Sequence, residues 1–182
     1  MPLNLELKAR VESLGRIREI AQRAGAEERV TVRQTDTYFK VNRGRLKLRE
    51  IDGREAELIS YERGEEEQAR WSRYEKTPAA EPSRLRTMLC AAIGELVTVR
   101  KTRELLLLEG NRIHLDTVEG LGTFIEFEIP AEEEEPARIH MDRLRSLFGI
   151  SPSDVLLHSY SDMLLGALKG SSKVGSPKGE GA

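Results

Sequence analysis

The sequence predicts an α+β fold: an eight-stranded antiparallel closed β-barrel, or tunnel, with helices packed outside. The main observation is an alternation of apolar and charged residues in several segments, for example Arg-Leu-Lys-Leu-Arg at 45–49. Successive side chains of a strand point to opposite faces, so such segments have one apolar face and one face of mixed charge. A barrel with an ionic interior explains this pattern more economically than an open sheet, and closure also removes exposed strand edges.

Eight segments are expected to form strands, namely residues 3–11, 29–41, 45–51, 55–62, 68–76, 96–108, 112–118 and 123–129. The first alternates strictly, and the second is rich in β-branched and aromatic residues, which favour strands. Asp52-Gly53 is a strong signal for a two-residue hairpin between the third and fourth segments. Gly110-Asn111 and the pair Gly120 and Gly122 supply later turns.

Apolar residues at helical spacing predict four helices, over residues 14–24, 83–93, 136–149 and 153–169, with a break expected near His158 in the last. Ser13 is placed to cap the first helix, and Gly25 to end it. Residues 170–182 are Gly, Ser, Lys, Pro and similar types that cannot bury a core, so we expect a disordered tail. The predicted domain therefore covers residues 1–169.

Composition narrows the class of protein. At 182 residues the chain has the length of one domain, and its net charge of -2 provides no overall field that would attract nucleic acid. The single Cys90 excludes an internal disulfide framework and fits a reducing compartment. No signal peptide opens the chain, and no stretch approaches the roughly 20 apolar residues of a membrane helix. We expect a cytoplasmic protein without a membrane or nucleic-acid partner.

Cations recur on the charged faces of the expected strands: Lys8, Arg10, Arg45, Lys47, Arg49, Lys101 and Arg103. If the alternation is followed consistently, they share the inner surface of the barrel. Arginine offers a planar fork to phosphate and lysine a compact charge, so cations that converge from different strands suit the successive phosphates of a linear triphosphate. The alternative is that they face solvent from an open sheet.

Carboxylates occupy the same inferred face at Glu6, Asp116, Glu126 and Glu128. Two carboxylates separated by one strand residue point the same way, about 6 to 7 Å apart. With a carboxylate from a neighbouring strand they are suited to hold Mg²⁺ or Mn²⁺. The alternative is that they form salt bridges with the cations. His114 is expected to form a hydrogen bond inside the barrel and not to be a metal ligand.

Six short motifs, in this order and spacing, resemble the CYTH superfamily of triphosphate tunnel metalloenzymes. They are Asn4-Leu-Glu6-Leu-Lys8, Gly44-Arg-Leu-Lys47-Leu-Arg49, Val99-Arg-Lys101-Thr-Arg103, Arg112-Ile-His-Leu-Asp116, Gly122-Thr-Phe-Ile-Glu126-Phe-Glu128 and Ser159-Tyr160-Ser-Asp162. The resemblance spans nearly the whole chain. It implies an eight-stranded antiparallel tunnel that binds a triphosphate through basic rows and a divalent metal through acidic ones.

The resemblance also implies individual roles. The implied phosphate contacts are Lys8, Lys47, Arg49, Lys101 and Arg103, with Arg70 and Lys76 as further contacts on the fifth strand, and the implied metal ligands are Glu6, Glu126 and Glu128, with Asp116 as an accessory ligand. Tyr38 is expected to face Lys8 and to help position or activate a nucleophile, which makes these two the candidate catalytic residues; the alternative for Tyr38 is a residue of the tunnel wall. Asn4 departs from the family pattern, because it replaces the first glutamate and brings an amide oxygen without a charge.

Three functions follow as expectations. The first is metal-dependent hydrolysis of tripolyphosphate, a nucleoside triphosphate or thiamine triphosphate. The second is cyclisation of ATP to cyclic AMP and pyrophosphate. The third, favoured by Asn4, is a non-catalytic module that binds polyphosphate or a nucleotide. An open sheet that serves only as a protein-interaction scaffold is a further alternative, and a homodimer is left open by the sequence.

Overall fold

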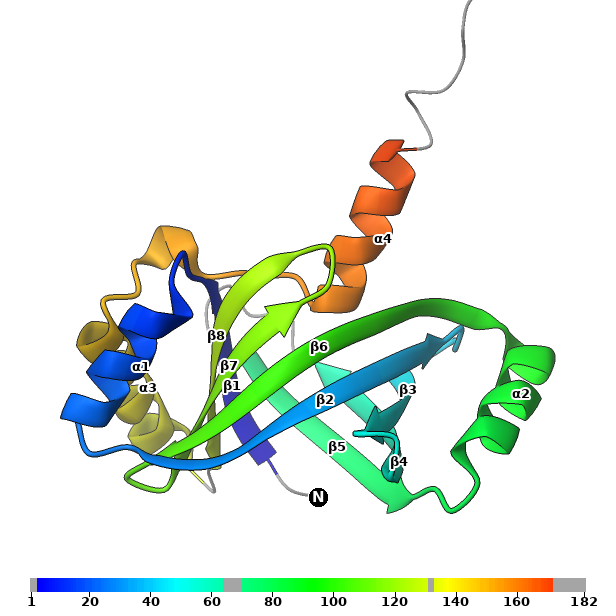
Figure 1. Ribbon diagram of the computed structural model, residues 1–182, viewed down its shortest axis with the longest axis horizontal. Helices are drawn as coiled ribbons and strands as arrows, with labels where there is room; N and C mark the ends of the chain where they lie inside the picture. The colour runs from blue at the N-terminus through cyan, green and yellow to red at the C-terminus, as the bar shows by residue number, and fades with distance from the viewer. Residues whose placement is uncertain (1–2, 64–69, 131–132, 172–182) are drawn as a thin grey trace, which may run out of the picture.

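The strands of the computed structural model, which describes residues 3–63, 70–130 and 133–171, form a closed barrel. They are β1 (Leu3–Arg10), β2 (Glu27–Phe39), β3 (Arg45–Ile51), β4 (Glu55–Arg63), β5 (Arg70–Pro78), β6 (Glu95–Leu108), β7 (Asn111–Val118) and β8 (Gly122–Pro130). All neighbours are antiparallel, in the order β1-β5-β4-β3-β2-β6-β7-β8, and β8 pairs with β1. The predicted fold class is confirmed (Figure 1).

The described residues also include four α-helices and one 3₁₀ turn, which lie outside the barrel: α1 (Leu14–Arg23), α2 (Pro82–Ile93), α3 (Glu134–Phe148), η1 (Pro152–Asp154) and α4 (Tyr160–Ser171). As expected, the Ser13 side chain caps α1, accepting a hydrogen bond from the Arg16 amide at 3.3 Å. None of the helices in the described part of the chain is both long and apolar enough to cross a membrane. The disordered tail was expected over residues 170–182, and residues 172–182 of it lie outside the described part of the chain.

Because apolar and charged residues alternate along the strands, apolar side chains form a core outside the barrel wall and charged side chains line a cavity inside it. Outward-pointing residues such as Leu5, Leu7 and Phe127 are at most 2% exposed and pack under α1 and α3. Burying one such side chain stabilises the fold by about 1.5–3 kcal/mol. A register slip of one residue would turn these side chains into the barrel, so the core fixes which residues face inward.

The helices cover the barrel unequally. The outer faces of β1, β6, β7 and β8 carry the large core beneath α1 and α3, and we call these four strands the helix-covered wall. The remaining strands, β2 to β5, form the opposite wall, where α2 packs against β2 and β3 over a small cluster around Phe39 and Leu48. Figure 1 shows α1 and α3 together at one side and α2 at the far end.

The predicted hairpin at Asp52-Gly53 is confirmed. The Arg54 amide donates to the Ile51 carbonyl at 3.0 Å, and both central residues have positive φ, 50° for Asp52 and 67° for Gly53. Two consecutive residues of this kind make the turn that matches the twist of paired strands. The turn sets the register between β3 and β4 and thereby the inward position of Lys47 and Arg49.

The single helix expected over residues 153–169 is wrong in its first part, although the expected break near His158 is present. The chain is helical only in η1 and again from Tyr160. Between them, Val155 forms a bridge with Ala9, and the Leu156 amide donates to the Lys8 carbonyl at 2.8 Å. Among the described residues, the pairing of β5 with β1 runs from Leu3 to Glu6, and the contacts of this segment with β1 lie beyond it, at Lys8 and Ala9.

Candidate functional site

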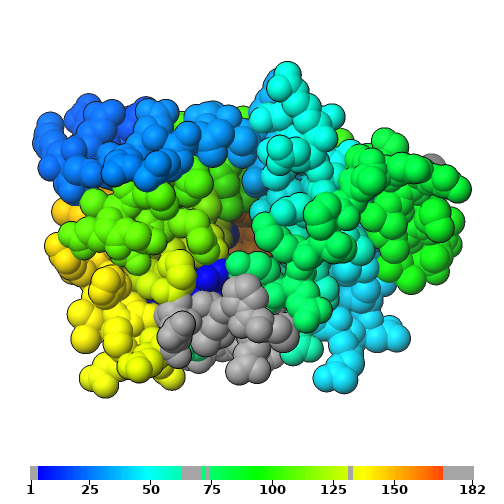
Figure 2. All heavy atoms as spheres, turned by 90° about the horizontal axis from the view of Figure 1, so that it is seen from below, coloured from blue at the N-terminus to red at the C-terminus, as the bar shows by residue number. Residues whose placement is uncertain are grey.

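The barrel encloses a cavity of about 750 Å³. Its lining comes from all eight strands and, at one end, from Ser159 and Tyr160. Figure 2 looks toward the other end and shows the molecule hollowed between the strands, with orange atoms of the C-terminal part of the chain at the back. The inner faces that the alternation predicted therefore meet in one enclosed space.

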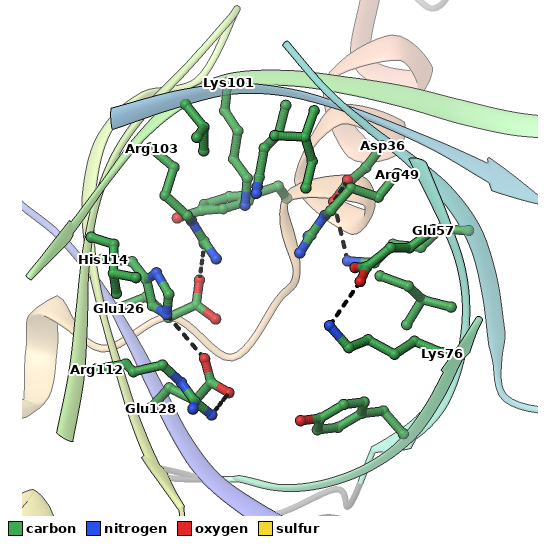
Figure 3. A pocket seen from close by; sticks show the side chains of 18 of the residues that line it. Asp36, Arg49, Glu57, Lys76, Lys101, Arg103, Arg112, His114, Glu126 and Glu128 are labelled. Atoms are coloured by element: carbon green, nitrogen blue, oxygen red, sulfur yellow. Dashed lines mark hydrogen bonds and ion pairs between the residues drawn. The ribbon is translucent and has the colours of Figure 1, made fainter. Parts of the chain in front are cut away.

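On the helix-covered wall, five inner charged residues form one connected cluster, part of which Figure 3 shows. Lys8 Nζ lies 2.7 Å from Glu126 Oε2, and Arg103 Nη2 lies 2.8 Å from the same oxygen. Arg103 also binds Asp116 through two nitrogens, at 2.7 and 2.6 Å, while Lys101 Nζ lies 3.4 Å from Asp116. All five residues are at most 9% exposed. The wall thus presents cations and carboxylates that hold one another in fixed positions.

Burial and the neighbouring charges set the ionisation of this cluster. Burial alone would raise the pKa of Glu126, but Lys8 and Arg103 outweigh it and hold that pKa well below its usual value. Burial, followed by the charge of Arg103, lowers the pKa of Lys101 to about 7. The carboxylate is therefore ionised at neutral pH, whereas the charge of Lys101 responds to whatever binds beside it.

Glu128 is the centre of a second group on the same wall. Asn4 Nδ2 donates to Glu128 Oε1 at 2.6 Å, and Arg112 Nη2 donates to the same oxygen. His114 Nε2 lies 3.0 Å from Glu128 Oε2, which confirms the expected hydrogen bond inside the barrel. The Asn4 amide, which replaces the first glutamate of the family pattern, thus acts as a donor to Glu128.

On the opposite wall, Asp36 forms ion pairs with two of the inward-facing cations. Arg49 binds it through two nitrogens, both at 2.7 Å, and Lys47 Nζ lies 3.1 Å away. Burial works to raise the pKa of Asp36, but Arg49 and Lys47 outweigh it and keep the pKa well below its usual value. A separate pair, Lys76 and Glu57, lies at 2.8 Å and is partly open to solvent.

Ten of the predicted site residues line the cavity: Glu6, Lys8, Tyr38, Lys47, Arg49, Lys76, Lys101, Arg103, Glu126 and Glu128. Asp116 is fully buried behind them, in contact with Arg103. The side chain of Arg70 lies outside the described part of the structure.

Arg10 and Arg45, which the alternation placed on the inner surface, do not line the cavity. Arg10 is exposed at the end of β1, where it donates to the Leu121 carbonyl at 2.8 Å. Arg45 turns to the start of α4 and binds Ser159 at 3.0 Å and Asp162 at 2.9 Å. Both residues lie where the barrel ends, so their side chains do not reach the cavity although the alternation assigns them to the inner face.

Sequence reasoning assigned no site role to Asp36, Glu57, Arg112 and Tyr160, although all four line the cavity. Tyr160 enters from the first turn of α4, donates its hydroxyl to Asp116 at 2.9 Å, and presents its ring 4.2 Å from Lys8 Nζ. The predicted partner of Lys8, Tyr38, also lines the cavity, and Lys47 Nζ lies 5.5 Å from its ring centre.

The acidic residues fit a divalent ion in kind, and they occupy neighbouring positions on two paired strands. Glu6 and Glu128 are direct partners in the register of β1 and β8, and Glu126 lies one inward position further along β8. Their oxygens are the ligands that Mg²⁺ and Mn²⁺ prefer. Within the described residues, however, no group of three or more His, Cys, Asp or Glu side chains is gathered to hold a metal ion. The cations already paired with Glu126 and Glu128 would compete with an ion for these oxygens.

Comparison with known proteins identifies the family. The model of the CYTH domain matches residues 3–160, whereas no curated protein matches the chain. A conserved hypothetical protein from Pyrococcus furiosus is 20% identical, with a TM-score of 0.80 over 87% of this chain and 98% of that one. A proposed adenylate cyclase from Vibrio parahaemolyticus is 23% identical, with a TM-score of 0.74 over 90% and 98%. A proposed adenylyl cyclase from Hippeastrum, described as having a dominant triphosphatase activity, is 17% identical, with a TM-score of 0.64 over 93% and 96%.

At these identities the structural likenesses show the fold alone, whereas the family model covers most of the described chain. The match includes all of the strands and nearly all of the motifs that bring cations and carboxylates together in the cavity. The chain belongs to the CYTH domain family.

Proposed function

We propose that this protein is an enzyme that hydrolyses a triphosphate inside its barrel, with Mg²⁺ or Mn²⁺ as cofactor. The observation that carries the proposal is the convergence of five cations, Lys8, Lys47, Arg49, Lys101 and Arg103, from three strands on one cavity. The substrates in question are tripolyphosphate, a nucleoside triphosphate or thiamine triphosphate. The triphosphatase activity described for the structurally similar Hippeastrum protein supports the same direction.

The geometry of the two arginines supports phosphate binding. Each of the two arginines donates to a carboxylate through two nitrogens: Arg49 to Asp36, and Arg103 to Asp116. Phosphate oxygens accept from the same planar fork, so a substrate phosphate would share or replace these contacts. Lys101 would gain its full charge beside an anion, because a nearby negative charge raises a pKa that burial had lowered.

Glu6, Glu126 and Glu128 would hold the divalent ion, which supplies neutralisation of the phosphate oxygens when it is bound. Lys8 is placed between Glu126 and the Tyr160 ring, where its charge faces the cavity. We retain Lys8 and Tyr38 as candidate catalytic residues, with Lys8 stabilising charge on the reacting phosphate and Tyr38 positioning the nucleophile.

Cyclisation of ATP is the second candidate. The description of the Vibrio parahaemolyticus protein as a proposed adenylate cyclase favours it, and a cavity of about 750 Å³ lies within the range of small-molecule sites, about 300–1,000 Å³. A non-catalytic binding module is the third candidate, since Asn4 removes one negative charge from the acidic row and weaker metal placement would harm chemistry more than binding.

Product analysis separates the three. The full chain is incubated with tripolyphosphate, ATP or thiamine triphosphate, together with Mg²⁺ or Mn²⁺. Released orthophosphate is the result we expect. Formation of cyclic AMP and pyrophosphate would show that the enzyme cyclises ATP and does not hydrolyse it. Tight binding without any product would show that the protein is a non-catalytic binding module.

A further inference from the structure

One part of the cavity wall is apolar although most of the wall is charged. Val30, Val32, Ile51 and Leu105 all line the cavity, and we call these four residues the apolar shelf. Val30 is the direct partner of Leu105 across β2 and β6, and Val32 follows at the next inward position of β2. The shelf lies toward the open end of the barrel, because Val30 is 45% exposed, whereas Tyr160, at the α4 end, is 5% exposed.

Gln34 borders the shelf and has an unsatisfied polar atom. It is the cross-strand partner of Ile51 and lines the cavity at 7% exposure. Its side-chain oxygen is buried and has no hydrogen-bond donor among the described residues. Leaving a buried acceptor unpaired is unfavourable, so an N–H group brought by a ligand would find a prepared partner there.

The shelf adjoins the cations that the proposed function assigns to phosphate. Across β2 and β6, Gln34 is the direct partner of Lys101, and Val32 is the direct partner of Arg103. A ligand whose phosphates contact these two cations would therefore place the group attached to its phosphates beside the shelf and Gln34. A bare tripolyphosphate has only charged oxygens and gains nothing from apolar surface.

We propose that the apolar shelf and Gln34 bind the organic group of a triphosphate ester, and that this group is a flat heterocycle carrying an amino group. The ring would cover the apolar side chains, and the amino group would donate to the Gln34 side-chain oxygen. The inference rests on the proposed function for the phosphate end, and it selects a nucleoside triphosphate or thiamine triphosphate over bare tripolyphosphate.

The test is equilibrium binding to the full chain by calorimetry, in EDTA, which removes the divalent ions that the proposed reaction needs. The probes are ATP, ITP, thiamine triphosphate and tripolyphosphate. ITP has a keto group where ATP has the amino group. Tripolyphosphate carries the higher charge density, so electrostatics alone would favour it. We expect instead that ATP, thiamine triphosphate or both bind about tenfold more tightly than tripolyphosphate, and whichever binds more tightly identifies the heterocycle.

The variant Gln34→Leu sharpens the test. It should weaken binding of the preferred amino-bearing ester about 3- to 10-fold, the value of one neutral hydrogen bond, and leave tripolyphosphate and ITP within twofold of the wild type. Ile51→Thr keeps the Gln34 acceptor and reduces the apolar surface, so it should weaken the binding of both esters and leave the binding of tripolyphosphate unchanged. This variant also provides the test if Gln34→Leu does not fold. Thr31→Ala, on the exposed side of the same strand, is the matched control and should change nothing.

Equal or tighter binding of tripolyphosphate, or a Gln34→Leu variant that loses affinity for every probe alike, would overturn the inference and leave the proposed function standing. Failure of the wild type to bind any of the four probes in EDTA would also overturn the inference. The proposed function, which includes a divalent ion, would fall with it only if the incubations with Mg²⁺ or Mn²⁺ yielded no product.

Discussion

The two walls of the barrel hold their charges differently. On the helix-covered wall, the side chains of Lys8 and Glu126 are 8% and 11% exposed, and they belong to a chain of contacts that runs on through Arg103 to Asp116. On the opposite wall, Lys76 and Glu57 form an isolated pair whose side chains are 52% and 26% exposed. The helix-covered wall thus contains a network of buried ion pairs, whereas the opposite wall combines the buried Asp36 with a solvent-accessible pair.

The difference follows from what lies behind each wall. The helix-covered wall is backed by the large core under α1 and α3, whereas the buried residues in the core of the opposite wall, within the described chain, are Phe39, Leu48 and Ala56. Side chains held by a packed layer keep their geometry, which chemistry requires. We therefore expect the helix-covered wall to carry the charged groups of the reaction. The opposite wall should contribute to binding and, through Tyr38 of β2, position the nucleophile.

The largest expected effect is that of Glu126→Gln. The substitution keeps the shape of the side chain but removes the charge that holds Lys8 and that would hold a divalent ion. We expect turnover of the active substrate to fall about 100-fold or more, with the fold retained by circular dichroism. The matched variant on the opposite wall is Glu57→Gln, for which the loss should stay within a few-fold. Unchanged turnover in Glu126→Gln, or equal losses in the two variants, would remove the assignment of the reaction to the helix-covered wall.

Asp36→Asn tests the strongly buried carboxylate that the described part of the opposite wall contains. Arg49 and Lys47 would lose the charge that balances them, so we expect the free energy of unfolding at pH 7 to fall by about 3–5 kcal/mol. The wild-type contribution is present above the unfolded pKa, near 3.9, and is lost as the pH falls toward the lowered folded pKa. Urea denaturation should show the gap between the two proteins closing below about pH 4. A gap of constant size down to pH 2 would contradict the pairing.

Asn4→Glu restores the glutamate of the family pattern. A further carboxylate beside Glu128, whose oxygen Asn4 now contacts at 2.6 Å, should repel it without metal and bind a divalent ion more tightly. We expect the Mn²⁺ concentration at half-saturation to fall about tenfold, measured by paramagnetic resonance of free Mn²⁺. Asn4→Gln is the uncharged control. An unchanged half-saturation in Asn4→Glu would place the metal away from this end of β1.

Lys76→Met is expected to have the smallest effect. Exposed ion pairs contribute about 0–1 kcal/mol, so the melting temperature should hardly change. If this lysine touches the substrate, KM should rise a few-fold while kcat stays constant, because the loss concerns binding alone. A fall in kcat with constant KM would show that the charged residues of the opposite wall take part in the reaction.

Alternation predicted which residues face inward but not which of them pair. Three buried ion pairs of the barrel interior, Lys8 with Glu126, Asp36 with Arg49 and Arg103 with Asp116, are all direct cross-strand partners. Such pairs depend on register, which the hairpin at Asp52-Gly53 revealed for only one pair of strands. Asp36 was missed as a site residue because it stands between Thr35 and Thr37, where no contrast of apolar and charged residues marks the faces.

The α4 end of the site was beyond prediction for a different reason. Tyr160 reaches the cavity from a helix, so no strand alternation points to it. Its local signal is the Ser159-x-x-Asp162 pattern, in which each side chain accepts from the other residue's amide, at 3.2 and 3.1 Å. This pattern starts α4 at Tyr160, and the bond from Arg45 to Asp162 ties the helix to the barrel. A capping box identifies a helix start but gives no information on where the helix docks.

The most direct test of the account is a crystal structure of the full chain with a non-hydrolysable ATP analogue and Mn²⁺. We predict anomalous scattering from Mn²⁺ beside Glu6, Glu126 and Glu128 and phosphate oxygens on Lys101 and Arg103, inside the barrel. Phosphates bound on the outer surface, with Lys47, Arg103 and Glu128 free of ligand, would contradict the central claim that the enclosed charges are the triphosphate site.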